Sequence, residues 1–194
     1  MTVKFEAPFA ELEIDKNEAF RYAGIKGEAD ESLNRLYEKA YELLAESLKP
    51  KAVYKFYDCT YFEDGVIIGD EKIHSQGLKT FLKESKGCAL MAATAGIAAD
   101  RLINRYSLCE PSLALMLDAL AAATVEALCN KMCKEIFKVS CHRRFSPGYG
   151  DFPIAYQRFI IDELGATLNI GVTLTESLMS APSKSVTAVI PKDV

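Results

Sequence analysis

One long apolar segment in the second half of the chain constrains the fold more than any other feature. Between Pro111 and Phe137, apolar residues return every three or four positions, which is the spacing of one face of an α-helix. Proline is well tolerated in the first turn of a helix, so Pro111 marks the expected start. We therefore predict one long helix whose apolar stripe faces the core. The stripe consists of Leu113, Leu117, Leu120, Thr124, Leu128 and Met132.

The same segment is not expected to cross a membrane. Its most apolar part, Leu113 to Leu128, is interrupted by Asp118 and Glu126 and is shorter than a bilayer requires. The N-terminus has no basic region followed by an apolar run, so nothing suggests a secretory signal. We therefore expect a cytoplasmic protein without membrane contact.

Size and charge limit the classes of function. A chain of 194 residues, 49% of them hydrophobic, suits one domain whose core needs neither disulfides nor a structural metal. The net charge of −4 leaves no excess of lysine and arginine to neutralise phosphates. We therefore expect no nucleic acid as the main partner.

The other elements follow from residue type and spacing. The first 30 residues are charged and irregular, and Asp30 is a suitable N-cap for a helix that continues to Leu48. Because strands come in pairs and helices in runs, the expected fold class is α+β with an antiparallel sheet packed with helices. We predict strands at 52–62, 66–68, 88–94, 167–174 and 185–190, and shorter helices at 78–85, 97–106 and 153–164.

The six cysteines are expected to be structural, because without an export signal a disulfide framework is not expected. Cys88 and Cys129 lie in apolar runs that are typical of buried thiols. Cys129 and Cys133 share a helix face, with Cys141 and His142 nearby, so a metal or cluster site is an alternative. Their spacing matches no common zinc pattern, and we predict no metal site.

The loop from Arg144 to Pro153 has residues that suit a ligand. Arginine can bind a carboxylate through two parallel hydrogen bonds. Gly148 lets the backbone approach a ligand closely, and Pro147 holds that approach rigid. Tyr149 adds an aromatic face and a hydroxyl. The set suits an amino-acid-like ligand carrying an aromatic base, although local chemistry alone favours an ordinary loop between helices.

A second segment, Leu174 to Pro182, precedes the strand that begins at Ser185, and by itself it is a polar connection. Taken in order, the two segments resemble the activation domain of cobalamin-dependent methionine synthase. That family has Arg-x-x-x-Gly-Tyr-x-x-x-Pro, then a helix, Leu-Thr-Glu-Ser, a methionine, a proline and Ser-Val. The residues that match here are Arg144, Gly148, Tyr149, Pro153, Leu174 to Ser177, Met179, Pro182, Ser185 and Val186.

The resemblance implies a role for each matched residue. Arg144 would bind the carboxylate of S-adenosylmethionine, Phe145 would contribute backbone groups, and Glu126 would attract the sulfonium or ammonium charge. Gly148 and Tyr149 would lie between S-adenosylmethionine and the corrinoid. The residues facing the corrinoid would be Pro147, Gly148, Tyr149, Met179 and Pro182. We expect Arg144→Ala to weaken ligand binding with little loss of stability.

The resemblance also implies a domain organisation and a function. Residues 1–194 would form one activation-domain-like domain, with a variable helical part at 1–50 and a family-like core at 51–190. The chain would support reductive methylation of cobalamin carried by methionine synthase or a related corrinoid protein, with a flavodoxin-type electron donor. It would then be an accessory part of a methyltransferase system for methionine biosynthesis. The alternative is a non-catalytic module that caps a corrinoid protein and has a vestigial S-adenosylmethionine pocket.

The sequence departs from the family pattern at two places. The family chain continues past its Ser-Val strand with aromatic residues, one of which contacts S-adenosylmethionine, whereas this sequence ends four residues after Ile190. An acidic residue near the start of the family domain has no clear counterpart in residues 1–50. These departures predict a pocket that binds weakly alone, is completed by a partner, or has lost S-adenosylmethionine.

Overall fold

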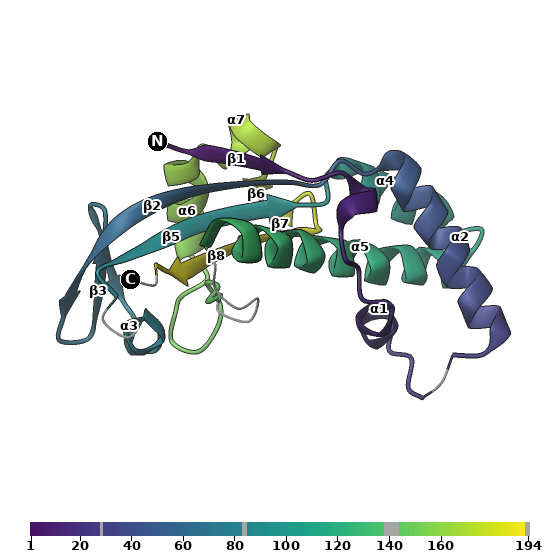
Figure 1. The fold of residues 1–194 in the computed structure, drawn as a ribbon, viewed down its shortest axis with the longest axis horizontal. Helices are drawn as coiled ribbons and strands as arrows, with labels where there is room; N and C mark the ends of the chain where they lie inside the picture. Colours follow the sequence, from purple (N-terminus) through teal and green to yellow (C-terminus); the bar gives the residue numbers. More distant parts are fainter. Residues whose placement is uncertain (28, 83–84, 138–143, 193–194) are drawn as a thin grey trace.

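The computed structural model describes residues 1–27, 29–82, 85–137 and 144–192 of the chain. Figure 1 shows a curved sheet at one end of an elongated molecule and a group of helices at the other. The long helix α5 (Pro111–Met132) runs along one face of the sheet and continues into the helical end. It therefore connects the two halves of the molecule.

The sheet is built around two neighbouring strands, β2 (Lys51–Phe62) and β5 (Gly87–Thr94). Its other strands are β1 (Val3–Glu6), β3 (Gly65–Ile68), β4 (Glu71–His74) and β8 (Ser185–Pro191). The order is β4–β3–β2–β5–β8, with β1 beside the first part of β2, and these described pairings are antiparallel. The predicted α+β class with an antiparallel sheet is confirmed.

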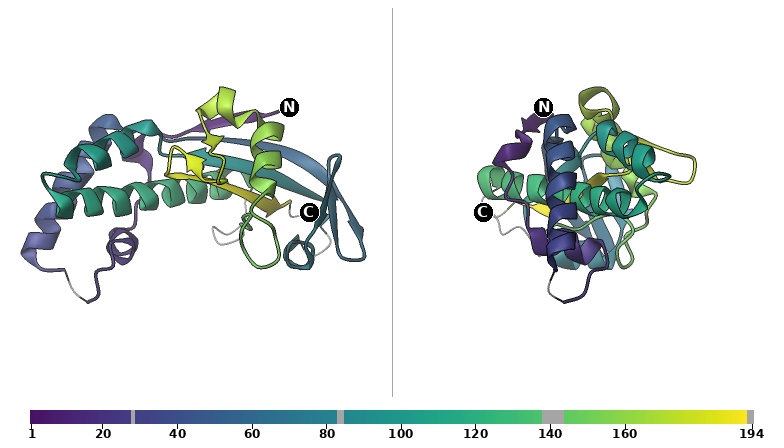
Figure 2. Two further views of the ribbon diagram at one scale, coloured as in Figure 1. Left: turned by 180° about the vertical axis from the view of Figure 1, so that it is seen from behind. Right: turned by 90° about the vertical axis from the view of Figure 1, so that its right-hand side faces the viewer.

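The sheet separates two apolar cores, which explains why β5 is buried along its whole length on both faces. One core lies between the sheet and helices α1, α2, α4 and α5. The other lies between the opposite face and helices α3, α6 and α7 (Figure 2). The bounds of these helices are α1 (Lys16–Tyr22), α2 (Glu31–Ser47), α3 (Gln76–Leu82), α4 (Ile97–Tyr106), α6 (Tyr156–Leu164) and α7 (Ala166–Ile170).

Helix α5 occurs where the spacing predicts it, and it is followed by one π-helical turn at Cys133–Phe137. The expectation that this segment is too short to cross a membrane is wrong for the helix as a whole. By length and composition alone, Pro111–Ile136 is long and apolar enough to span a bilayer. However, 72% of its most apolar window is buried inside the protein. Such burial is typical of a core helix, and Cys129 is buried on it as predicted.

Residues 1–27 contain regular secondary structure, contrary to the expectation of an irregular segment. They form β1, the 3₁₀ turn η1 (Phe9–Glu11) and α1, whose N-cap Asp15 accepts a hydrogen bond from the Asn17 amide. Phe9 packs against Tyr41 of α2, and Phe20 packs against Tyr37. Tertiary contacts with α2 and α5 thus order a segment whose local pattern is weak.

The predicted strand at 167–174 is also wrong over most of its length. Residues Ala166–Ile170 form the single-turn helix α7, and extended pairing begins at β6 (Thr173–Leu174), which pairs with β7 (Ser180–Ala181). Gly165 and Gly171 flank α7 with φ values of 55° and 74°, a left-handed conformation that glycine adopts easily. These two turns override the β propensity of the segment between them.

Candidate functional site

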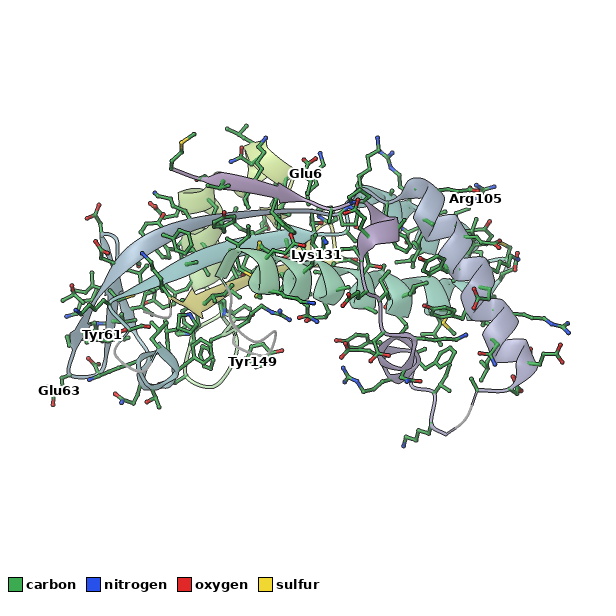
Figure 3. The ribbon with its side chains drawn as sticks, viewed as in Figure 1. Glu6, Tyr61, Glu63, Arg105, Lys131 and Tyr149 are labelled. Carbon is green, nitrogen blue, oxygen red and sulfur yellow. The ribbon has the colours of Figure 1, made fainter. Side chains whose placement is uncertain are left out.

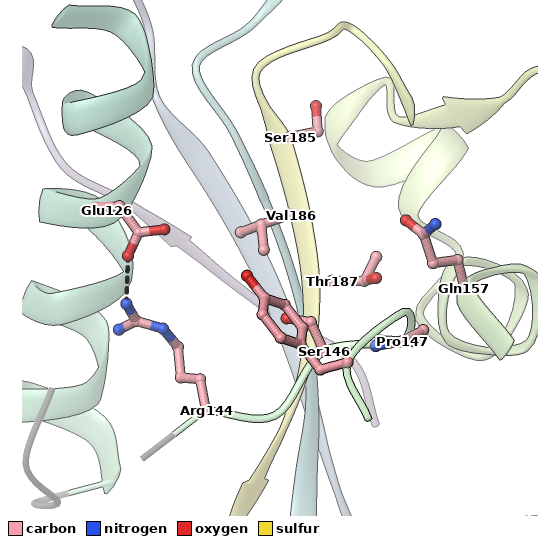
Figure 4. Close-up of a pocket in the computed structure, with 9 residues that line it drawn as sticks. Glu126, Arg144, Ser146, Pro147, Gln157, Ser185, Val186 and Thr187 are labelled. Atoms are coloured by element: carbon pink, nitrogen blue, oxygen red, sulfur yellow. Dashed lines mark hydrogen bonds and ion pairs between the residues drawn. The ribbon is translucent and has the colours of Figure 1, made fainter. Parts of the chain in front are cut away.

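A cavity of about 400 Å³ opens between the C-terminal half of α5, the loop 144–153, the start of α6 and the start of β8 (Figure 4). Its walls are therefore drawn from four segments that are distant in the sequence. The lining residues are Glu126, Arg144, Ser146, Pro147, Tyr149, Gln157, Ser185, Val186 and Thr187.

The most strongly polar feature of the cavity is an ion pair. Arg144 Nη2 lies 2.5 Å from Glu126 Oε2, and Nη1 donates to Asn130 Oδ1 at 2.7 Å. Glu126 and Asn130 are four residues apart, so they share one face of α5. The side chain of Arg144 is 14% exposed and that of Glu126 is 34% exposed. The pair is thus shielded yet still open to the cavity.

The electrostatics of Arg144 favour a permanent cation. Burial opposes the positive charge, but Cys129, Glu126 and a hydrogen bond to Cys133 together outweigh it and raise the pKa of Arg144 above its ordinary value. The cavity therefore presents a fixed guanidinium next to a carboxylate. This combination suits a zwitterionic ligand that has an acidic and a cationic group.

The loop that carries Arg144 is fastened to the sheet at Phe145. The Phe145 amide donates to the Val189 carbonyl at 3.0 Å, and the Val189 amide donates to the Phe145 carbonyl at 2.8 Å. The Phe145 ring stacks on Phe81 of α3 and on Phe152. Phe145 does not line the cavity, and its backbone groups extend the edge of the sheet.

Beyond Phe145 the loop turns tightly through Gly148. The Gly148 amide donates to the Phe152 carbonyl at 2.7 Å, and its φ of 97° is a conformation that L side chains rarely adopt. A Cβ there would also lie 3.0 Å from Ile154 Cδ1. Gly148 thus shapes the turn without lining the cavity, while Pro147 and Tyr149 on either side do line it.

Tyr149 lines the cavity, yet 67% of its surface is exposed. Figure 3 labels its side chain beside the sheet. Further along the loop, Asp151 fastens the loop to the start of α3. Its carboxylate accepts hydrogen bonds from Ser75 Oγ at 2.7 Å and from the amides of Gln76 and Gly77 at 2.7 and 3.0 Å. These bonds fasten the loop to the start of α3, in addition to its attachment to Val189.

The second sequence segment lies beside the cavity. Met179 is 66% exposed in the hairpin between β6 and β7, and Pro182 follows a cis peptide bond after Ala181. Neither residue lines the cavity. The structure therefore brings Arg144, Glu126, Pro147 and Tyr149 together in the lining, whereas Phe145, Gly148, Met179 and Pro182 are not among the lining residues.

Sequence reasoning missed part of the lining. Ser185 and Val186 support the family resemblance but were assigned no site role, and Ser146 is a loop residue without a distinctive signal. Gln157 and Thr187 are both buried polar residues on apolar elements, at 9% and 2% exposure. A polar residue on the apolar face of a predicted helix or strand is the signal that would have indicated them.

The alternative of a metal or cluster site finds no support in the described part of the chain. There, no group of three histidine, cysteine or acidic residues is placed to hold a metal ion. Burial raises the pKa of the Cys129 thiol to about 12, so the thiolate needed for ligation is disfavoured. Cys141 and His142, which completed that alternative, lie outside the described residues.

Comparisons with known proteins identify the fold. No family profile and no curated protein matches the sequence. The crystal structure of the MetH reactivation domain bound to AdoHcy matches with a TM-score of 0.79 and 18% sequence identity. The match covers 99% of this chain and 78% of that chain. The chain thus has the fold of this reactivation domain, and the activation-domain-like fold predicted from the two segments is confirmed.

Proposed function

We propose that this chain binds S-adenosylmethionine in the cavity beside Arg144 and supports reductive methylation of a corrinoid carried by a partner protein. One observation carries the proposal. The chain shares its fold with a domain that was solved with AdoHcy, and it has a cavity lined by Glu126, Arg144 and Tyr149, to which the family resemblance gives ligand-binding roles. The cavity volume of about 400 Å³ lies within the usual range for small-molecule sites.

The polar groups of the cavity fit this ligand. A guanidinium has five N–H donors, so Arg144 can bind the ligand carboxylate while it keeps its bonds to Glu126 and Asn130. The Glu126 carboxylate would attract the ammonium or sulfonium charge. Tyr149 offers an aromatic face that would lie between the ligand and the docked corrinoid. Burial of the Arg144–Glu126 pair strengthens these interactions, because less water screens them.

In the proposed reaction the chain binds and orients its ligand and performs no acid–base step. A corrinoid held by the partner and reduced by an external donor would supply the nucleophile for the methyl group, and the C–S bonding pair would stay on the sulfur of the departing S-adenosylhomocysteine. Pro147 and Tyr149 would hold the sulfonium methyl toward the partner, so their contribution is proximity and exclusion of water. We also propose methionine synthase or a related corrinoid protein as partner, a flavodoxin-type donor and a cytoplasmic location.

Calorimetric titration with AdoHcy and with S-adenosylmethionine tests the proposal. Each titration is run on the chain alone and with a cobalamin-loaded methionine synthase fragment that lacks its own reactivation domain. We expect binding heat at least when the partner is present, and loss of that heat in Arg144→Ala. Absence of heat in both conditions would overturn the proposal. Retained association with the corrinoid fragment would then support the non-catalytic capping module instead.

A further inference from the structure

We infer that Gln157 couples the cavity to the hairpin of residues 173–181, so that a ligand in the cavity steadies the hairpin. This inference rests on the function proposed above. Gln157 is the second residue of α6, and its side chain lines the cavity across from Arg144 (Figure 4). Gln157 is 9% exposed, so most of the residue is shielded from solvent.

The same amide holds the hairpin. Gln157 Nε2 donates to the Leu178 carbonyl at 3.2 Å, and Oε1 accepts from Ser180 Oγ at 3.4 Å. Leu178 and Ser180 flank Met179, which is exposed in the turn. One buried side chain therefore contacts both the cavity and the residues on either side of Met179.

The chemistry of a primary amide allows both contacts at once. The NH₂ group has two hydrogens and the carbonyl oxygen has two lone pairs, so each end can make a second hydrogen bond. Gln157 can keep its bonds to Leu178 and Ser180 while it bonds a polar atom of a ligand. A ligand that fills the cavity would also limit rotation of the side chain, and the hairpin would lose mobility as a result.

The hairpin depends on such support because its turn contains an unfavourable backbone conformation. Leu178 has a φ of 62°, in the left-handed region that branched side chains rarely adopt. Thr175 closes the turn locally, since its amide donates to the Met179 carbonyl and its hydroxyl accepts from the Met179 amide. Gln157 bonds the carbonyl of the strained residue from outside the turn. Loss of the Gln157 side chain would therefore release the turn as well as remove a ligand contact.

Coupling of this kind is reciprocal. If ligand in the cavity steadies the hairpin, then a partner that immobilises the hairpin raises ligand affinity by the same factor. This reciprocity would explain how the chain could bind its ligand more tightly when docked on a partner. It also makes Gln157 a positioning residue, because it acts on the hairpin through contacts away from the transferred methyl group.

Two variants of Gln157 and one control test the coupling. Gln157→Met preserves length without hydrogen bonds, and Gln157→Glu preserves shape and the acceptor without the N–H donors. Ser180→Ala is the matched control, because it removes the longer of the two hairpin bonds and leaves the amide in place. The measurements are AdoHcy affinity by calorimetry and hydrogen exchange of the Leu178 and Met179 amides with and without AdoHcy. Urea unfolding of each variant verifies that the fold is intact.

We expect AdoHcy to slow exchange of these two amides severalfold in the unaltered chain and in Ser180→Ala. In Gln157→Met the affinity should fall about tenfold, which is the effect of losing one or two hydrogen bonds. The ligand-induced slowing should also disappear in Gln157→Met.

If AdoHcy slows exchange equally in Gln157→Met and in the unaltered chain, the coupling is wrong while the proposed function stands. If AdoHcy does not bind the unaltered chain, faster hairpin exchange in ligand-free Gln157→Met still supports the tether, and unchanged exchange overturns it.

Discussion

Arg144 Nη2 and Glu126 Oε2 lie 2.5 Å apart, although the two residues are 18 positions apart in the sequence. The pair joins the loop 144–153 to the central helix α5, and Asn130 adds a second contact one helical turn further along. Arg144 is therefore both a candidate ligand-binding residue and a structural link. This dual role alters what a substitution at Arg144 should do.

We predict that Arg144→Ala abolishes AdoHcy binding and lowers the free energy of unfolding by about 1–2 kcal/mol, because it leaves a partly buried carboxylate without its partner. The sequence alone predicts little loss of stability. Urea unfolding of Arg144→Ala, of Glu126→Ala and of the double variant measures the coupling energy of the pair. Strictly additive effects on stability would show that the ion pair contributes nothing.

Tyr149→Ala should separate ligand binding from stability. Tyr149 lines the cavity but is 67% exposed, so its loss should change the free energy of unfolding by no more than about 0.5 kcal/mol. AdoHcy affinity should nevertheless fall, because an aromatic face of the cavity lining is removed. Calorimetry and urea unfolding on the same preparation provide both values. A large loss of stability with unchanged affinity would contradict this assignment.

Gly77 and Asp151 should be energetically coupled. A Cβ at Gly77 would lie 2.7 Å from Asp151 Oδ1, so Gly77→Ala should displace the carboxylate and destabilise the protein. In an Asp151→Ala background the same change should no longer destabilise, since alanine is the better helix former. A double-mutant cycle by urea unfolding tests this expectation. Equal destabilisation by Gly77→Ala in both backgrounds would argue against the contact.

The contribution of Asp151 should also depend on pH. The Ser75 hydroxyl and the Gln76 and Gly77 amides lower the pKa of Asp151 below its ordinary value by bonding the ionised carboxylate. A group with a lowered folded pKa stabilises the fold above its unfolded pKa of about 3.9 and loses this effect as pH falls through the folded pKa. The advantage of the unaltered chain over Asp151→Asn should be present at neutral pH and shrink below about pH 4.

Cysteine labelling should distinguish exposed from buried thiols. Cys129 is completely buried and burial raises its pKa to about 12, whereas Cys109 is exposed at the end of the turn before α5. At neutral pH iodoacetamide should label Cys109 in the folded protein and Cys129 only after unfolding. Peptide mass spectrometry identifies the labelled sites. Rapid labelling of Cys129 in the folded state would reopen the metal alternative.

How much of the fold follows from the sequence depends on how local its causes are. The periodicity of α5, the Asp30 cap of α2 and the apolar run of β5 are each contained in one segment, and the structure confirms them. The structure differs from the prediction at residues 1–27 and 166–170, because distant packing decides the conformation of the first segment and two left-handed glycines decide that of the second. Local propensity is a weak guide where tertiary contacts or special turns dominate.

The same division applies to the cavity. The sequence by itself determined the residues of one wall, because Arg144, Pro147 and Tyr149 lie in a single segment that resembles the activation-domain motif. Only the tertiary structure decided that Glu126 pairs with Arg144 and that Gln157 lies opposite them with Ser185 and Thr187. These residues come from α5, α6 and β8, and their meeting depends on how the loop at Phe145 docks on the edge of the sheet. Such a juxtaposition is a property of packing, which no single segment encodes.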